Sequence, residues 1–142
     1  MRALELASAL GARLPAAVTA IGKVQLAFVS ARDAEVRFDS SRFVEFARIR
    51  ALGYALDEGA TVPGVACVAA PVFSQNGCCG AIDVSALIHG GPTREAVIEA
   101  VIEAAARATV RLGGVQPQAF AMDQRRDLLS GNKAPQRPET SG

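Results

Sequence analysis

Apolar residues recur along the chain first at helical spacing and then in alternation, and this change of period predicts the order of the elements. The first stripe predicts a short helical lead-in over residues 1–13, which ends at Gly11. The next predicts a helix that opens at residues 19–23 and fades by about Ser30. The core-facing positions expected on it are Val24, Leu26, Ala27 and Phe28.

A polar stretch over residues 31–39 separates this helix from the next one. Asp39, Ser40 or Ser41 can cap the next helix, because a short side-chain oxygen accepts a hydrogen bond from a first-turn amide. Gly53 is expected to end it in the left-handed conformation. Its apolar positions at helical spacing are Phe43, Phe46, Ile49 and Leu52.

The middle of the chain has the pattern of strands. Residues 54–57 predict a short strand, and residues 58–64, with two glycines and a proline, predict a loop. Residues 65–73 and 78–86 predict two antiparallel strands joined by the turn at residues 74–77. This hairpin is the clearest β signal in the sequence.

A long helix is expected to start at Thr93, or at Gly91 ahead of Pro92, and to end at Gly113 and Gly114. Its buried face is expected to carry Val97, Val101, Ala105, Ala108 and Leu112.

Beyond this helix, residues 115–142 are rich in Pro, Gln, Arg, Ser and Gly, so we expect a largely disordered tail broken only by a short helix at residues 122–129. The pattern as a whole predicts one α+β domain over residues 14–114, with helices packed on an antiparallel sheet.

Composition narrows the class of protein. Half of the 142 residues are apolar, enough for one packed core, and the net charge of +1 gives no basic surplus for a nucleic-acid surface. Glu5 and Arg13 interrupt the apolar start, so no signal peptide is predicted, and no run approaches the roughly 18 apolar residues of a membrane helix. Three cysteines, an odd number, favour free thiols in a cytoplasmic protein.

Three blocks of sequence occur in an informative order. The first is residues 14–23, LPAAVTAIGK. The second is residues 47–58, ARIRALGYALDE, followed by residues 63–72, PGVACVAAPV. The third is residues 82–86, IDVSA. Over about residues 14–112 the chain thereby resembles the effector-binding domain of IclR-family transcriptional regulators.

The resemblance implies a GAF- or profilin-like fold, a ligand cavity on one side of the sheet and assembly into homodimers or homotetramers. It also implies a small organic effector as ligand and no cofactor. In full-length members a winged helix-turn-helix precedes the domain, and nothing before Leu14 is long enough to form one. Control of transcription is therefore expected to pass through a DNA-binding part absent from this chain, or through a full-length regulator as partner.

The resemblance places ligand-facing amides at Ala20 and Ile21, in the opening turn of a helix. Such a turn leaves N–H groups unpaired and carries a partial positive charge, and Gly22 would let a ligand approach the backbone. The alternative for Gly22 is that it only permits close packing of the helix.

Asp57 and Cys67 match positions that line the ligand pocket in the family. A carboxylate accepts hydrogen bonds from a ligand hydroxyl, and a thiol is a weak donor on an apolar wall. The alternatives are a loop cap for Asp57 and core packing for Cys67.

Asp83 and Ser85 join this pocket only in one register of the hairpin. If residues 76–77 alone form the loop, Cys67 lies opposite Ala86, and both polar residues point to the other face. If residues 75–77 form the loop with a bulge at Gly77, Cys67 lies opposite Ser85 and the polar side chains share a face. We favour the second register because it preserves a polar pocket.

The carboxylate of Asp83 also affects which ligand is expected. It would repel an anionic ligand unless one of the two were protonated. A hydroxylated, amine-bearing or neutral effector is therefore favoured over an acid.

Three other classes of function have some support in the sequence. An enzyme with Cys67 as nucleophile would need a base, and the single histidine, His89, lies beyond the hairpin, so no enzyme is predicted. A metal site on Cys78 and Cys79 is disfavoured because adjacent strand residues point to opposite faces. A truncated oligomerisation or remnant module without ligand binding is the main alternative, since missing strands would leave an open sheet edge.

Overall fold

The computed structural model describes residues 11, 13–28 and 40–117. In order, the elements are α1 (Ala20–Phe28), α2 (Ser40–Leu52), β1 (Ala55–Glu58), β2 (Val65–Ser74), β3 (Gly77–Leu87) and α3 (Arg94–Arg111). The predicted helix on residues 4–10, the polar stretch before Ser40 and the short helix at residues 122–129 lie outside the described residues.

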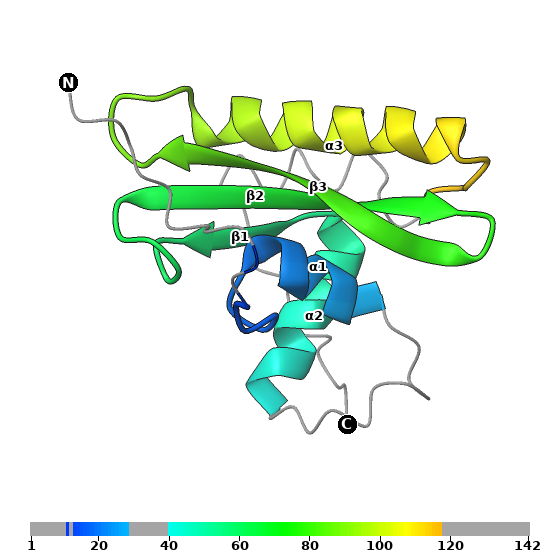
Figure 1. Ribbon diagram of the computed structural model, residues 1–142, viewed down its shortest axis with the longest axis horizontal. Helices are drawn as coiled ribbons and strands as arrows, with labels where there is room; N and C mark the ends of the chain where they lie inside the picture. The colour runs from blue at the N-terminus through cyan, green and yellow to red at the C-terminus, as the bar shows by residue number, and fades with distance from the viewer. Residues whose placement is uncertain (1–10, 12, 29–39, 118–142) are drawn as a thin grey trace, which may run out of the picture.

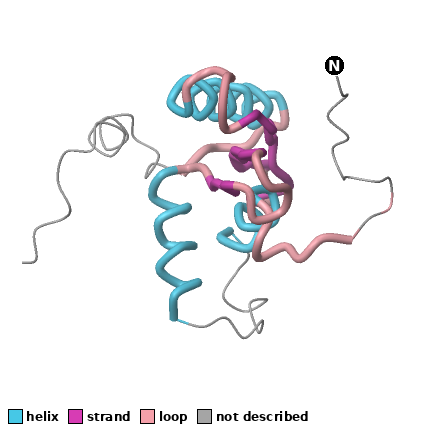
Figure 2. Tube along the Cα trace, turned by 90° about the vertical axis from the view of Figure 1, so that its left-hand side faces the viewer, coloured by secondary structure: helices cyan, strands magenta, loops and turns pink. Residues whose placement is uncertain are grey.

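The three strands form one antiparallel sheet in the order β1-β2-β3, with β2 in the centre. Helix α3 lies along one face of this sheet, and α1 and α2 lie on the other (Figure 1). Turned by 90°, the chain shows the strands as a thin layer between these two sets of helices (Figure 2). The predicted α+β class is confirmed.

Alternate residues of β2 supply two separate hydrophobic cores. Val68, Ala70 and Val72 pack with the buried face of α3, whereas Ala69 packs with α1 and α2. At the end of β2, the ring of Phe73 meets that of Phe28 edge-on, with centroids 5.2 Å apart. Because both faces of β2 are covered, it is the most apolar strand of the sheet.

Helix α3 begins as predicted. The Thr93 side chain accepts a hydrogen bond from the Ala96 amide, and Gly113, with φ of 69°, follows the last turn. Leu112, predicted on the buried face, is instead the C-cap residue beyond the last helical turn and is 52% exposed. The buried residues of the helix are Ile98, Val101, Ile102, Ala105 and Thr109.

Helix α2 ends at Leu52, and Gly53 follows with a φ of 77°, the predicted left-handed stop. Phe46, Ile49 and Leu52 are buried as predicted, but Phe43 is 59% exposed. The reason is the direction of the helix, whose first turn lies farthest from the sheet (Figure 1).

No helix in the described ranges has the length and apolar character needed to cross a bilayer.

The β2–β3 hairpin has the favoured register, with Cys67 opposite Ser85, but its turn and its bulge differ from those predicted. The turn contains only residues 75 and 76, and Gly77 has the expected positive φ, 104°. The predicted bulge at Gly77 is wrong: the pairing shifts between Val72 and Phe73, and Cys79 is the unpaired extra residue. Without a bulge, a two-residue turn would shift β3 by one position relative to β2. The extra residue in the bulge restores the register.

Candidate functional site

A row of polar side chains crosses all three strands on the sheet face that packs against α1. Asp57 pairs with Cys67, and Cys67 pairs with Ser85. Asp83 lies two positions before Ser85 on the same face of β3, opposite Ala69. The predicted register is therefore confirmed, and the structure brings together four of the predicted site residues.

Cys67 and Ser85 make a direct contact at the centre of the row. The Cys67 Sγ and the Ser85 Oγ are 3.2 Å apart, and either can donate. Burial raises the pKa of the Cys67 thiol, the hydrogen bond with Ser85 lowers it in part, and the nearby carboxylates of Asp83 and Asp57 raise it. Cys67 is therefore a neutral thiol at neutral pH, suited to a pocket wall rather than to nucleophilic attack.

Asp57 is 2% exposed, and both of its carboxylate oxygens are used by the loop that follows β1. One oxygen accepts a hydrogen bond from the Ala60 amide at 2.8 Å, and the other accepts from the Thr61 hydroxyl. These contacts close the turn between β1 and β2. Loop capping, the alternative considered for Asp57, is thus its observed role.

Asp83 lies at the more exposed end of the row. Partial burial raises the pKa of its carboxyl group. The proton needed to admit an anionic ligand is therefore gained at a higher pH than in a free carboxyl group.

The opening of α1 lies over the same face, because Cys67 packs against the cluster that contains Ala20. The Gly22 amide donates to the Thr19 hydroxyl at 3.1 Å. A Cβ at Gly22 would overlap the carbonyl oxygen of Ala16, so this glycine allows close packing. The Gly22 amide is thus used by the Thr19 hydroxyl. The first-turn amides that remain are those of Ala20 and Ile21, which have no acceptor within the helix.

Lys23 is a residue of the site region that the sequence reasoning did not single out. Its Nζ donates to the Leu56 carbonyl at 3.0 Å and pairs with Glu45 at 2.8 Å, which ties α1 to β1 and α2. Arg42 of α2 adds a hydrogen bond to the Ala17 carbonyl at 2.8 Å, just before α1. The signal in the sequence was the position of Lys23 at the end of the block at residues 14–23, next to Gly22.

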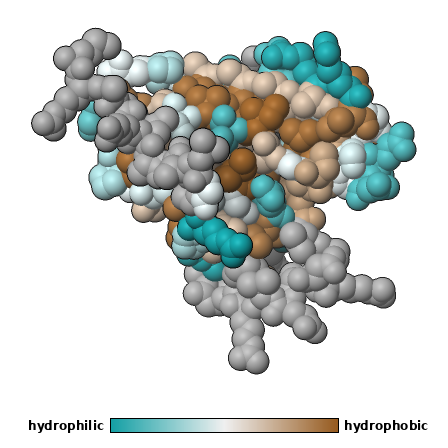
Figure 3. Space-filling view, viewed as in Figure 1, coloured by the Kyte–Doolittle hydropathy of each residue, from teal (hydrophilic) through white to brown (hydrophobic). Residues whose placement is uncertain are grey.

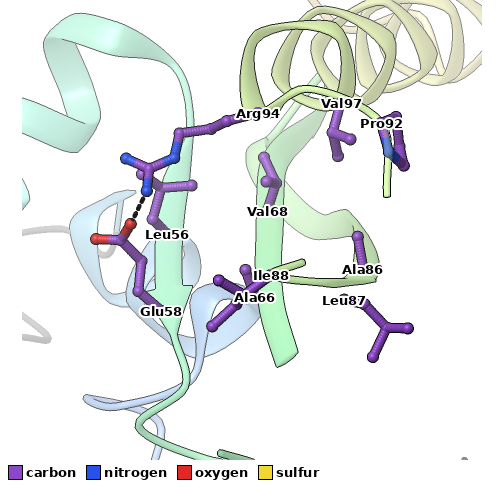
Figure 4. Close-up of a pocket in the computed structure, with 10 residues that line it drawn as sticks. All are labelled: Leu56, Glu58, Ala66, Val68, Ala86, Leu87, Ile88, Pro92, Arg94 and Val97. Carbon is purple, nitrogen blue, oxygen red and sulfur yellow. Dashed lines mark hydrogen bonds and ion pairs between the residues drawn. The ribbon is translucent and has the colours of Figure 1, made fainter. Parts of the chain in front are cut away.

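A cavity of about 110 Å³ lies on the opposite, α3 face of the sheet (Figure 4). Leu56, Val68 and Val97 line it, and an ion pair between Arg94 and Glu58 lies at its side. None of the predicted ligand residues lines this cavity, because the strand residues around it have the opposite parity, apart from Leu87 at the end of β3. Its volume is also small against the roughly 300 Å³ of an ordinary ligand site.

His89 is exposed in the loop after β3. Within the described ranges, no three His, Cys, Asp or Glu side chains lie close enough to hold a metal ion.

The structure defines the chain as an α+β domain with a polar row on one face of its sheet, and comparison with known families gives the affiliation. Residues 39–110, from the start of α2 to the end of α3, match the family of bacterial transcriptional regulator IclR C-terminal domains. The match spans half of the sequence, and the chain belongs to this family. No curated protein matches it.

Solved structures of IclR-type regulators have the same fold. Thermotoga maritima IclR gives a TM-score of 0.63 at 26% identity, over 80% of this chain and 53% of that one. Pseudomonas aeruginosa HmgR gives 0.69 at 23% identity, over 82% and 53%. The inducer-binding domain of Acinetobacter PobR, as a double mutant with 3-hydroxybenzoic acid, gives 0.59 at 21% identity, over 72% and 67%. The chain thus spans about half the length of IclR and HmgR.

Proposed function

We propose that residues 14–114 form an effector-binding domain, which holds a small organic molecule between the opening of α1 and the polar row of the sheet. The observation that carries this proposal is the placement of Cys67, Ser85 and Asp83 on one face, beneath the helix turn that holds Ala20 and Ile21. Asp57 shapes the rim of this site through the loop that it closes.

The side chains of the site favour a small hydroxylated, amine-bearing or neutral ligand. The Cys67 and Ser85 groups can each donate or accept one hydrogen bond, and the amides of Ala20 and Ile21 can donate to a ligand oxygen. The Asp83 carboxylate accepts from a hydroxyl or amine but repels an acid. The ligand in the PobR complex is both hydroxylated and acidic, so the experiment below compares acids with their neutral analogues.

Regulation of transcription would follow from a shift of equilibrium. A ligand that binds one arrangement of a homodimer or homotetramer more tightly than another favours that arrangement. A DNA-binding part, outside this domain or on a full-length regulator as partner, would read the change. This domain itself has no catalytic role in the proposal.

Thermal unfolding of the full chain tests ligand binding. The panel contains small aliphatic and aromatic hydroxy acids with their neutral amide and amine analogues. A ligand that binds only the folded chain stabilises it by about 2.7 kcal/mol at 100 times its dissociation constant. We expect neutral or amine-bearing members to raise the melting temperature more than the matching acids at pH 7.5.

Two variants of adjacent residues locate the site. Ser85→Ala removes a hydroxyl from the polar row, and Ala86→Ser adds one on the opposite face of the same strand. We expect Ser85→Ala to weaken binding about tenfold, the value of one hydrogen bond of about 1.4 kcal/mol, and Ala86→Ser to leave binding unchanged. Equal losses in both variants would place the ligand elsewhere.

An oligomerisation module without ligand binding is the second candidate. It is favoured by the engagement of the Asp57 carboxylate and the Gly22 amide with the chain's own groups. If no member of the panel changes the melting temperature while the chain still assembles, this second function is the correct one.

A further inference from the structure

The cavity of about 110 Å³ on the α3 face of the sheet has a mainly apolar interior. Leu56 of β1, Val68 of β2 and Val97 of α3 lie around it (Figure 4). One wall is fixed by the backbone, because the Ile88 amide donates to the Gly64 carbonyl at 3.0 Å. Such a space holds water poorly, since a buried water needs two or more polar partners. An apolar group that enters it therefore displaces no well-bound water.

One ion pair supplies the charged groups among the described residues that line this cavity. The Arg94 guanidinium, in the first turn of α3, donates to the Glu58 carboxylate at the end of β1 (Figure 4). The two side chains are 58% and 53% exposed, so their pairing contributes little to stability and separates readily. An apolar space with a few charged groups at its side is the ordinary composition of a small-molecule site.

Apolar residues are also exposed at this end of the fold. Leu87 and Ile88 line the cavity and are 49% and 45% exposed. On the face shown in Figure 3, hydrophobic surface gathers where Figure 1 places β3 and α3, two of the elements that line the cavity. A ligand that covers Leu87 and Ile88 is stabilised by the apolar surface that it removes from water.

We propose that this cavity is a second binding site, which takes a small aliphatic amino acid as a free zwitterion. The aliphatic side chain of the ligand enters the cavity. The ligand carboxylate accepts hydrogen bonds from the Arg94 guanidinium, and the ligand ammonium group donates to the Glu58 carboxylate. The site is separate from the polar row, because Glu58 follows Asp57 directly on β1 and points to the opposite face of the sheet.

The two charges beside the cavity favour a ligand that carries both signs. A zwitterion gives Arg94 and Glu58 one new partner each, so that no charge is left unpaired. An acid without an ammonium group would bring a second carboxylate toward Glu58, and an amine without a carboxylate would bring a second cation toward Arg94. Either contact between like charges is unfavourable.

The volume of the cavity sets the size of the ligand side chain. A cavity of about 150 Å³ can hold a benzene ring, so one of 110 Å³ has room for about four carbon atoms. The side chains of valine, leucine and isoleucine are of this size. Alanine would leave most of the cavity empty, and the ring of phenylalanine would exceed it.

Isothermal titration calorimetry of the full chain with leucine tests the proposal. We expect saturable binding with a dissociation constant of about 0.1–1 mM, because so small a ligand makes few contacts. Alanine should bind at least about tenfold more weakly, since it buries less apolar surface. N-acetylleucine and leucinamide keep the side chain of leucine and lose one charge each, so both should also bind at least about tenfold more weakly.

Two variants locate the ligand. Glu58→Gln and Arg94→Gln each remove one charge of the pair, and each should weaken leucine binding about tenfold. Both side chains are more than half exposed, so we expect the variants to fold. Glu103→Gln changes the exposed ion pair with Arg107 farther along α3 and is the matched control, which should bind leucine as the original chain does. Circular dichroism checks the fold of all three variants.

Three results would overturn the proposal. The absence of saturable binding at leucine concentrations well above the expected dissociation constant would remove the site. Equal affinities for leucine and N-acetylleucine would refute recognition of a zwitterion. Loss of leucine binding in Ser85→Ala, without loss in Glu58→Gln, would place the ligand on the polar row instead. Failure of the hydroxylated ligands to bind the polar row would leave this second site unaffected, so the two proposals are tested separately.

Discussion

At the scale of single residues, the chemistry of the site depends on which polar groups the chain already uses. Asp57 and Gly22 hold neighbouring backbone, whereas Cys67, Ser85 and Asp83 face one another across β2 and β3. The identities of these residues could be predicted from the sequence. Their partners could not, because the Thr61 hydroxyl and the Ala16 carbonyl reach them through turns whose geometry has no periodic signal.

Asp83 gives a prediction about pH. Burial raises the pKa of its carboxyl group in the folded chain, so its contribution to stability is complete below the ordinary carboxyl pKa and is lost as the pH rises through the folded pKa. Asp83→Asn should therefore stabilise the chain at pH 7, by less than about 0.5 kcal/mol because solvent screens the group, and have no such effect near pH 3.

Urea unfolding at the two pH values measures this difference. Glu99→Gln, at an exposed carboxylate of α3, is the matched control and should show no comparable gain at pH 7. An equal gain from Asp83→Asn at both pH values would show that the effect does not come from the carboxylate charge.

At the scale of elements, spacing predicted the helices and strands well, and the hairpin shows where it was insufficient. The need for a polar face gave the correct pairing of Cys67 with Ser85, while the turn residues suggested a bulge at Gly77. The bulge formed at Cys79 instead, since a two-residue turn and a later bulge move the strand by the same one position. Local sequence does not distinguish these two solutions.

Helix α1 gives a second prediction, at Gly22. In an open helix, Gly→Ala stabilises by about 1 kcal/mol. Here the added Cβ would overlap the Ala16 backbone, which cannot move as a side chain can, so we expect Gly22→Ala to destabilise the chain by about 1–3 kcal/mol.

Chemical denaturation provides the measurement, with Gly80→Ala as the control. Nothing lies within 4 Å of a Cβ at Gly80, and its φ is not positive, so that variant should lose little or no stability. If Gly22→Ala were as stable as Gly80→Ala, close packing would not be the reason for the glycine.

At the scale of the whole molecule, the sheet separates two helical layers that border different features of the structure. The α1 and α2 layer packs on the face that carries the polar row, and the α3 layer borders the cavity lined by Leu56 and Val97. Strand parity decides which residue belongs to which layer, and the sequence pattern predicted this division. It did not predict the cavity, because its lining residues come from segments far apart in the chain.

One side chain connects the α3 layer to the end of the sheet. β1 pairs with β2 only as far as Ala69, and beyond it the buried hydroxyl of Thr109 accepts a hydrogen bond from the Phe73 amide at 3.0 Å. Thr109→Val removes this acceptor from the buried end of the sheet and should cost about 1–3 kcal/mol.

Thermal and urea unfolding test this prediction against Thr109→Ser, which keeps the hydroxyl and loses one methyl group, a cost of about 0.8 kcal/mol. A loss for valine no larger than for serine would mean that packing, rather than the hydrogen bond, holds α3 at this point.

The bulge at Cys79 has a consequence for how chains of this kind can vary in length. Deleting Cys79 would join Cys78 directly to Gly80 and leave every other pairing of the hairpin as it is. The tip of the hairpin thus tolerates the loss of one residue without turning Asp83 and Ser85 to the other face. In an alignment, a one-residue gap at this tip marks a change in the pairing of the strands and leaves the polar row on the same face of the sheet.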